Sequence, residues 1–230
     1  MYSIAIDGPA GAGKSTIAKR IAKELSFVYV DTGAMYRAIA LYFLRKGTDS
    51  ANIAEIEAEC PNIHVTIEYQ NGEQQVLLNG ENVNGFIRNE EVGNMASKTS
   101  SIPAVRAALL DLQRNMTKTA DILMDGRDIG TNVLPNADLK IYLTASSKVR
   151  ARRRYDELTA KGENCDLAVI EKDIIIRDEQ DMNRAIAPLK QAEDAVLVDS
   201  SDMTIDEVVD AIKEEFYKKC NRSGMDEVEK

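Results

Sequence analysis

The chain has 230 residues, of which 44% are hydrophobic, and its formal net charge is −9. This length and composition suffice for one sizeable α/β core with a small insert. The acidic balance argues against a nucleic-acid polymer as the main partner, because neutralising a phosphate backbone requires a basic face. Neither a long apolar run nor a signal-peptide pattern is present, so we expect a cytoplasmic protein with no membrane partner.

The cysteines and the single histidine indicate no metal or nucleophilic site. Cys60, Cys165 and Cys220 are far apart in the sequence and form no C-x-x-C pair that could bind zinc. So sparse a count is typical of a reducing compartment. His64 lies in the alternating stretch NIHVTIEY, which predicts a strand residue without the partners that a general base requires.

The first candidate site lies in the stretch IAIDGPAGAGKSTIAKRIAKEL, where residues 8–15 fit the pattern G-x-x-x-x-G-K-[ST]. Residues 2–6 before it are apolar and predict a buried parallel strand. Residues 15–25 after it repeat apolar side chains at helical spacing. Such a loop points its N–H groups at an anion. The motif therefore predicts a nucleoside triphosphate site in which Lys14 reaches the β- and γ-phosphates and Ser15 ligates Mg²⁺.

A second buried strand is predicted over residues 27–30, and a helix then runs from Ala34 until Gly47 ends it. Residues 61–88 differ in character, because they alternate polar and apolar side chains and contain an Asn-Gly hairpin signal at positions 71–72. We expect a small antiparallel insert of two strands, with room for a short third one. It would lie at the edge of the sheet or as a lobe over the site.

The remaining chain alternates helices and strands, as a parallel sheet requires. Further strands are predicted over residues 121–124, 139–143 and 196–198. Helices are predicted over residues 89–119 with a break at Pro103, over the charged residues 146–158, over 166–181, and from Thr204 to the polar tail at 221–230. Thr204 and Glu207 form a capping box. The fold class is therefore α/β, with a five-stranded parallel sheet flanked by helices.

Polar side chains follow the carboxyl end of each predicted strand, where ligands of open α/β sheets bind. Beyond the phosphate loop they are Asp31, Thr32, Tyr36, Arg37, Asp125, Arg127, Asp128, Ser146, Ser147, Arg150, Arg152, Arg153, Arg154, Asp199, Ser200 and Ser201. Arg37 and Arg127 can form the second anion site that a small-molecule kinase needs. Arg177, Asp181 and Arg184 share one helical face and add charge. A solvated charged face explains any one of these sets, but together they favour a phosphotransferase site.

The sequence resembles the bacterial cytidylate kinases, within the P-loop nucleoside monophosphate kinase superfamily. The motifs that carry the resemblance are GPAGAGKST, DTGAMYRA, DGRDIGT.V.P.A..KI.L.AS...RA.RR and RD..D.NRA.APL. They extend over residues 2–212 and include the β insert, which distinguishes this family from kinases with short inserts. The resemblance implies one P-loop kinase domain at 1–220, with a core (1–60, 89–145 and 182–220), a nucleotide-binding β insert (61–88), a helical lid region (146–181) and a polar tail (221–230).

The resemblance also implies an activity, because this family transfers the γ-phosphoryl group of ATP to CMP or dCMP with Mg²⁺. The residues implied at the ATP and metal site are Gly8, Pro9, Ala10, Gly11, Ala12, Gly13, Lys14, Ser15, Thr16, Arg150 and Arg153, with Ser15 as the metal ligand. Those implied at the acceptor are Arg37, Arg127 and Arg184 at the phosphate, Arg177 and Asp181 at the ribose, and Ser97, Arg106 and Asp128 at the cytosine. Tyr36 is implied as a wall of the acceptor site, and Thr32 as a further substrate-binding residue. Lys14, Arg127, Arg184 and Arg154 are the implied catalytic residues.

Two positions depart from the family pattern. Thr32 stands where many members have serine and keeps the hydroxyl, whereas Ala10 stands where some members have serine and lacks it. Two roles also stay open for Asp31 and Asp125, which could hold magnesium through water or cap helices and turns.

Two other interpretations share the phosphate loop. A kinase of another small acceptor, such as shikimate kinase or dephospho-CoA kinase, would lack the cytosine-reading set. A nucleotide-dependent switch or binding protein would have no use for paired acceptor arginines, and the guanine-reading N/T-K-x-D motif is absent. We further expect the β insert to move with the acceptor site and help enclose CMP, and we expect a monomer because nothing suggests an obligate apolar interface.

Overall fold

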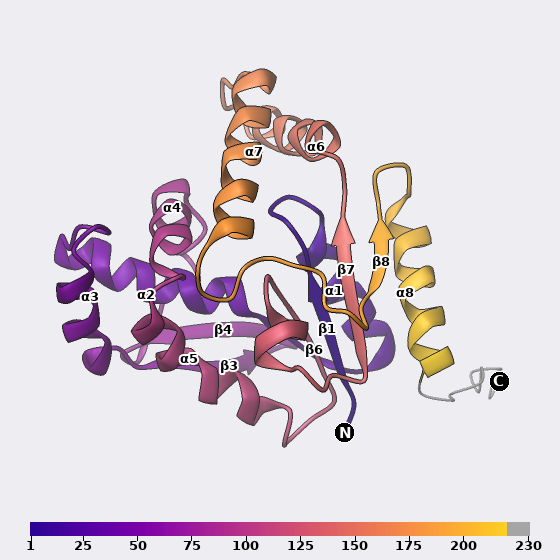
Figure 1. The fold of residues 1–230 in the computed structure, drawn as a ribbon, viewed down its shortest axis with the longest axis horizontal. Coiled ribbons are helices and arrows are strands. Elements are labelled where there is room, and N and C mark those ends of the chain that lie inside the picture. The colour runs from indigo at the N-terminus through magenta and orange to yellow at the C-terminus, as the bar shows by residue number, and fades with distance from the viewer. Residues whose placement is uncertain (220–230) are drawn as a thin grey trace.

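The computed structural model describes residues 1–219, and in this range five parallel strands form one central sheet in the order β2-β6-β1-β7-β8 (Figure 1). The strands are β1 (Ser3–Asp7), β2 (Val28–Asp31), β6 (Ile122–Gly126), β7 (Leu139–Thr144) and β8 (Val196–Asp199). The predicted sheet is confirmed. Each strand continues one or two residues further toward its carboxyl end than predicted, so that several acidic side chains belong to the strands themselves.

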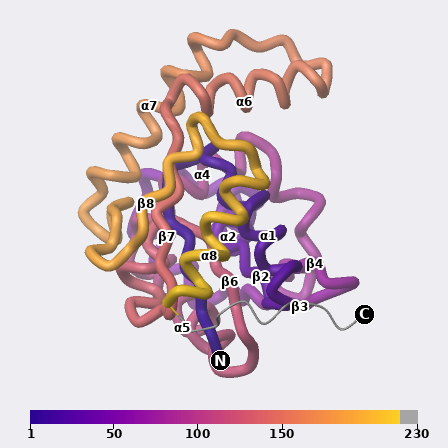
Figure 2. Tube along the Cα trace, turned by 90° about the vertical axis from the view of Figure 1, so that its right-hand side faces the viewer, coloured from indigo at the N-terminus to yellow at the C-terminus, as the bar shows by residue number. Residues whose placement is uncertain are grey.

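Helices cover both faces of the sheet. They are α1 (Lys14–Leu25), α2 (Thr32–Lys46), α3 (Ile53–Glu59), α4 (Glu90–Thr99), α5 (Pro103–Met116), α6 (Ser147–Ala160), α7 (Leu167–Asn183) and α8 (Ile205–Lys219). Alternation along β1 divides the core, since Ile4 and Ile6 pack with the apolar side chains of α1 and α8, whereas Ala5 packs with those of α2 and α5. Figure 2 shows α1 and α8 side by side on one side of the sheet. Burying each large aliphatic side chain stabilises the fold by about 1.5–3 kcal/mol.

The β insert forms a separate antiparallel sheet of β3 (Val65–Gln70), β4 (Glu73–Leu78) and β5 (Glu81–Asn82). The predicted hairpin is confirmed, because Asn71 and Gly72 have φ of 54° and 79°, the left-handed conformation that a two-residue type I′ turn requires. A second Asn-Gly pair at positions 79–80 makes the same turn and adds the short third strand. Tyr69 in β3 donates a hydrogen bond of 3.0 Å to the backbone carbonyl of Tyr29, which ties the insert to the edge strand β2.

The helices α6 and α7 form a pair beyond the carboxyl ends of the strands, at the top of Figure 1. Each begins just after a predicted start because a side chain caps it. Ser146 accepts a hydrogen bond from the Val149 amide at 3.3 Å, and Asp166 accepts one from the Ala168 amide at 2.7 Å. The pair can therefore lie over any ligand of the phosphate loop.

Two local features differ from the sequence expectation. The helix α2 begins at Thr32 rather than Ala34, because the Asp31 carboxylate caps it by accepting the Ala34 amide at 2.9 Å. A short π-helix, η2 (Ile129–Val133), follows β6 where no helix was predicted. Both features place acidic residues at element boundaries close to the strand ends.

Other expectations are confirmed in detail. The break predicted at Pro103 is present, because Pro103 starts α5 after α4 has ended. The capping box is present, since Glu207 accepts the Thr204 amide at 2.8 Å and Thr204 accepts the Glu207 amide at 3.3 Å. No helix in residues 1–219 is both long and apolar enough to cross a membrane.

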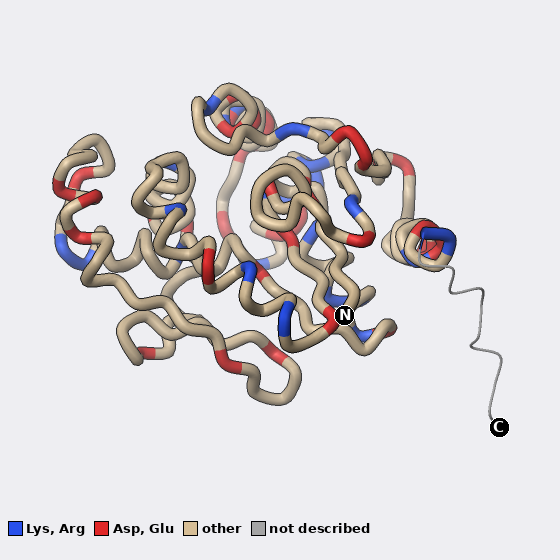
Figure 3. The backbone as a smooth tube through the Cα atoms, turned by 60° about the horizontal axis from the view of Figure 1, so that its bottom comes forward, with Lys and Arg blue, Asp and Glu red and all other residues tan. Residues whose placement is uncertain are grey.

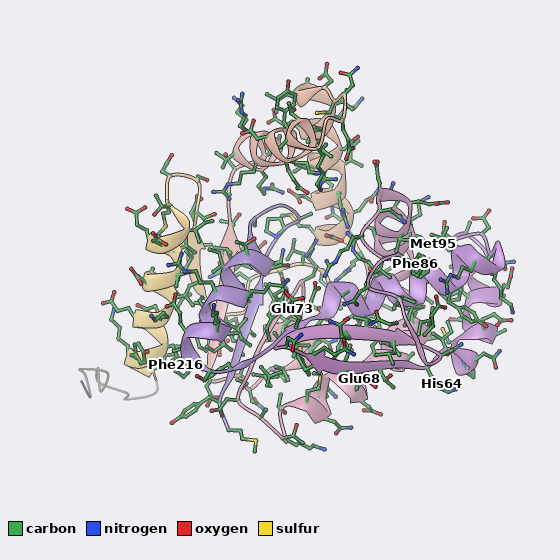
Figure 4. All side chains as sticks on the ribbon, turned by 180° about the vertical axis from the view of Figure 1, so that it is seen from behind. His64, Glu68, Glu73, Phe86, Met95 and Phe216 are labelled. Carbon is green, nitrogen blue, oxygen red and sulfur yellow. The ribbon has the colours of Figure 1, made fainter. Side chains whose placement is uncertain are left out.

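The single histidine and the polar tail are the last features for which the sequence carries an expectation. His64 is exposed, lies directly before β3 rather than within it, and is at the end of the insert farthest from α8 (Figure 4). Cys220 and the tail at 221–230 lie outside the described residues.

Candidate active site

The phosphate loop joins β1 to α1, and its glycines adopt backbone conformations that other residues rarely reach. Gly11 and Gly13 have φ of 76° and 88°. A Cβ atom at Gly8 would lie 1.9 Å from the backbone oxygen of Leu143 in β7, so a side chain cannot fit there. The loop is thus pressed against the sheet, with the amino end of α1 directly after it, and this geometry fits a bound phosphate group.

Lys14 is the first residue of α1 and is buried. Its Nζ atom donates a hydrogen bond of 2.7 Å to the backbone oxygen of Pro9 within the loop. Burial, with repulsion from Arg127, lowers the pKa of Lys14 from 10.5 to about 7. A phosphate bound in the loop would supply a negatively charged partner for this ammonium group.

Ser15 and Asp125 form a polar pair beside the loop that fits a magnesium ion. The Ser15 hydroxyl donates to one Asp125 oxygen at 2.8 Å, and the buried Tyr29 hydroxyl donates to the other at 3.0 Å. Within residues 1–219 no cluster of three His, Cys, Asp or Glu side chains could hold a metal alone. A magnesium ion at Ser15 would therefore take most of its oxygen ligands from phosphates and water, as is usual for this cation.

The Asp125 carboxylate is unfavourably placed without a cation. Burial, together with repulsion from Asp31, raises the pKa of Asp125 from 3.8 to about 6. The folded protein therefore holds a proton that the unfolded chain releases between these two pKa values, and it loses stability as the pH rises through that window.

We expect the Asp125→Asn protein to gain thermal stability relative to the wild type as the pH rises from about 4 to about 6, because asparagine does not titrate. The melting temperatures of both proteins, measured without nucleotide or magnesium, test this. Each kcal/mol should move the melting temperature by about 2–4 °C at this chain length. A difference that stays constant across the window would contradict the raised pKa.

Three arginines gather at the carboxyl end of the sheet, on the side of α2 and α7. Arg37 donates to the backbone oxygens of Ile87 and Asn89 at 3.1 and 3.3 Å. Burial and the nearby Arg177 lower the pKa of Arg37 to about 10, and burial and Arg127 lower the pKa of Arg177. Mutual repulsion of half-buried cations is typical of a site that binds an anion.

Two of these arginines differ in how they are held. Arg127 donates from Nε to the Asp181 carboxylate of α7 at 2.9 Å. The Nε of Arg177 is buried and has no hydrogen-bond partner, which is rare for a guanidinium nitrogen. A ligand oxygen could satisfy this atom.

Asp128 lies at the centre of a second cluster. It forms a buried ion pair with Arg106 and a looser one with Arg184, at 3.6 Å, and it accepts a hydrogen bond of 3.1 Å from Asn132. The Arg106 guanidinium lies 5.6 Å from the ring centre of Tyr36, in cation–π geometry. The cluster thus combines an acceptor, two donors and an aromatic surface, which can recognise a polar ring.

The structure brings most of the predicted acceptor residues together. Ser97 and Thr32 are connected to them only through neighbouring residues. Ser97 is half-buried on α4, one turn before Ser100, whose oxygens accept from Arg106 at 3.2 Å and Arg184 at 3.4 Å. The Thr32 hydroxyl donates to the backbone oxygen of Asp125 at 2.7 Å and so joins α2 to β6.

The predicted lid arginines occupy three different environments. Arg150 lies over the phosphate loop, where it donates to the backbone oxygen of Ala10 at 3.0 Å and pairs with Asp178 at 2.5 Å. Arg153 donates to the backbone oxygen of Ser200 at 2.7 Å, and a Cβ atom on Gly13 would lie 4.0 Å from it. Arg154 is exposed and pairs with Glu157 on its own helix. This arrangement brings Arg150 and Arg153 to the loop and leaves Arg154 outside it.

Sequence reasoning missed several polar residues around these clusters. Gln74 of β4 exchanges two hydrogen bonds with the Asp31 backbone, at 2.8 and 3.2 Å, and Arg88 pairs with the Asp31 carboxylate at 2.6 Å. Ser100, Asn132 and Asp7 were missed as well. The sequence pattern shows only that Gln74 is a polar residue in an alternating strand. It was missed because its partner, Asp31, lies on the other sheet.

Comparison with known proteins adds an independent finding. The family model described as cytidylate kinase matches residues 4–218. A cytidylate kinase of Caldicellulosiruptor saccharolyticus is 48% identical over 216 residues, which cover 94% of this chain and 96% of that protein. One of Alkaliphilus metalliredigens is 46% identical over the same shares. The crystal structure of an uncharacterized protein from Eubacterium ventriosum covers 94% of this chain and 98% of its own, with a TM-score of 0.53 at 9% identity, a likeness of fold alone.

Proposed function

Because this chain belongs to the cytidylate kinase family, we propose that it transfers the γ-phosphoryl group of ATP to CMP or dCMP, with Mg²⁺, to give ADP and CDP or dCDP. The observation that carries the proposal is the group of half-buried arginines at the carboxyl end of the sheet, with the Asp128 cluster beside it. A nucleoside monophosphate offers both a phosphate for the arginine group and a polar ring for the Asp128 cluster.

On the donor side, residues 8–16 hold the ATP phosphates and Lys14 contacts the β- and γ-phosphates. The buried ammonium group of Lys14 and the glycine conformations support this role. Magnesium, held by Ser15 and oriented through Asp125, would neutralise the phosphate oxygens. Arg150 and Arg153 complete the donor site from the lid, and Arg154 reaches it only if the lid moves.

On the acceptor side, Arg37, Arg127 and Arg184 hold the CMP phosphate, with Thr32 and Tyr36 beside it. Arg177 and Asp181 contact the ribose. The nucleophile is a phosphate oxygen that is already anionic, so no side chain must act as a strong base. The arginines instead offset the repulsion between two anionic phosphates and fix their geometry.

The base is read by Ser97, Arg106 and Asp128. The Asp128 carboxylate accepts a hydrogen bond from the 4-amino group of cytosine, and Arg106 donates to O2 and N3. Uracil has a carbonyl where cytosine has the amino group, so Asp128 would face an acceptor and lose its partner. A buried mismatch of this kind disfavours UMP.

The rest of the proposal concerns the organisation of the protein. The insert at 61–88 helps enclose CMP, supported by its bonds to Asp31, and residues 146–181 act as a lid. Basic and acidic residues are interspersed along the described backbone (Figure 3). We propose a monomer in the cytoplasm, and light scattering after size-exclusion chromatography tests the oligomeric state.

The test is a coupled assay of ADP release with Mg·ATP and CMP, dCMP, UMP, AMP or shikimate as the acceptor. CMP and dCMP should be strongly preferred, and Asp128→Asn should reduce the preference for CMP over UMP by about 10- to 100-fold, because an amide can donate to the uracil carbonyl. If no acceptor stimulates ADP release, the kinase proposal fails. If wild type uses UMP as well as CMP, the assignment of the base reader fails.

A further inference from the structure

Asp7 is a buried carboxylate to which none of the roles above has been assigned. It is the last residue of β1, directly before Gly8 of the phosphate loop, and its hydrogen bonds go to the segment that follows β6. One oxygen accepts the backbone N–H of Ile129 at 2.8 Å, and the other accepts that of Gly130 at 2.7 Å. Asp7 is 4% exposed, so these bonds lie in the protein interior.

Ile129 and Gly130 are the first two residues of η2, whose N–H groups have no partner inside the helix. Asp128 stands at the capping position, and an aspartate there ordinarily caps its own helix. Here the Asp128 side chain makes no cap bond. Asp7 therefore caps η2 from the end of strand β1.

The Asp128 carboxylate is thereby left for other partners. Its oxygens face Arg106, Arg184 and Asn132, which are the groups of the base-reading cluster. If the carboxylate turned back to cap η2, it would leave these donors. One side chain cannot serve both the cap and the base.

Gly130, the second residue of η2, packs closely against both Asp7 and Lys140. A Cβ atom at Gly130 would lie 3.1 Å from the Lys140 side chain and 3.4 Å from the Asp7 oxygen. Lys140 is itself fixed by an ion pair with Asp194 at 2.9 Å. The start of η2 therefore packs against both Asp7 and Lys140.

We propose that Asp7 is a positioning residue that caps η2 in place of Asp128 and so frees the Asp128 carboxylate to read the acceptor base. This inference rests on the proposed function of Asp128. It also assigns to β1 a link between the two substrates, because the residue that fixes the base reader immediately precedes the loop that holds the donor phosphates.

The test compares Asp7→Asn with Asp138→Asn. An amide at position 7 keeps the size of the side chain but can accept only one of the two N–H groups. Asp138 is the matched control, because its carboxylate accepts the Ser3 N–H at 2.7 Å at the opposite end of β1 and lies outside the site. The readouts are the ratio of kcat/KM for CMP over UMP, the KM for ATP and the melting temperature.

We expect Asp7→Asn to lower the CMP-over-UMP ratio by about tenfold, as a lost buried hydrogen bond does, with a smaller effect on the KM for ATP. Asp138→Asn should keep the ratio even if it lowers the melting temperature. If Asp7→Asn keeps the wild-type ratio, the inference is overturned while the proposed function stands. A wild-type enzyme that does not prefer CMP overturns the proposed role of Asp128 as base reader, and the inference with it.

A measurement on the wild type guards against a variant that does not fold. The amide protons of Ile129 and Gly130 should exchange with solvent as slowly as those inside β1, because the carboxylate holds both of them in a buried site. Fast exchange at both positions would overturn the cap itself.

Discussion

Replacing Lys14 with methionine should lower kcat/KM for ATP by roughly 10²- to 10³-fold, the loss expected when one preorganised charged donor is removed from a phosphoryl-transfer site. Methionine is unbranched and of similar length, so it can fill the buried space of the lysine stem. The ammonium group lies within the loop, 2.7 Å from the Pro9 carbonyl, and no carboxylate bonds to it directly. The loss should therefore reflect phosphate binding and not folding.

The lowered pKa of Lys14 predicts a second measurable effect, the uptake of a proton when ATP binds. With a pKa of about 7 in the free protein, Lys14 is roughly one-tenth protonated at pH 8. Bound phosphates favour the charged form, so ATP binding at this pH should take up close to one proton. Asp125, whose pKa is about 6, is already ionised there and adds little.

Calorimetry in two buffers with different ionisation enthalpies measures this uptake. Lys14→Met should abolish it, whereas Lys23→Met, at an exposed position of the same helix, should keep both the uptake and the activity. Wild-type uptake in Lys14→Met would show that another group binds the proton.

The sequence predicts the sheet well because its signals are local. Buried parallel strands are continuous apolar runs, and the phosphate loop and the first Asn-Gly turn each depend on a few adjacent residues. The strand ends were placed too early because Asp7, Asp31 and Asp125 look like loop residues when only hydrophobicity is considered. In the structure each of them is buried by partners that lie elsewhere in the chain.

What the sequence could not predict depends on contacts between distant residues. The π-helix η2 needs a cap from Asp7, which is 122 residues away from Ile129. Arg150 and Arg154 belong to one run of arginines, yet one lies over the phosphate loop and the other faces solvent. Composition alone does not tell which face of that helix meets the loop.

Arg127→Gln should lower kcat with CMP by roughly 10²- to 10³-fold while leaving ATP binding nearly unchanged. The charge of Arg127 acts on both halves of the site. It lowers the pKa of Lys14 on the donor side, and it lowers those of Arg37 and Arg177 on the acceptor side. In the proposed mechanism, a cation between these two halves would lie close to the transferred phosphoryl group.

Arg127→Lys separates charge from shape in this prediction. Lysine keeps the positive charge but lacks the planar fork that can hold Asp181 and a phosphate oxygen together, so we expect an intermediate loss of kcat. Arg45→Lys is the matched control, because Arg45 pairs with Glu81 on the exposed side of the insert. A change in the KM for CMP with kcat intact would restrict Arg127 to holding the acceptor.

Proton uptake gives an independent measure of how strongly the charge of Arg127 acts on Lys14. Removing its charge takes away a repulsion that lowers the pKa of Lys14, so Lys14 should be more protonated before ATP binds. Arg127→Gln should therefore take up fewer protons than the wild type when it binds ATP at pH 8. If the uptake is unchanged, the charge of Arg127 does not reach the donor site, and its contribution to kcat must come from the acceptor side alone.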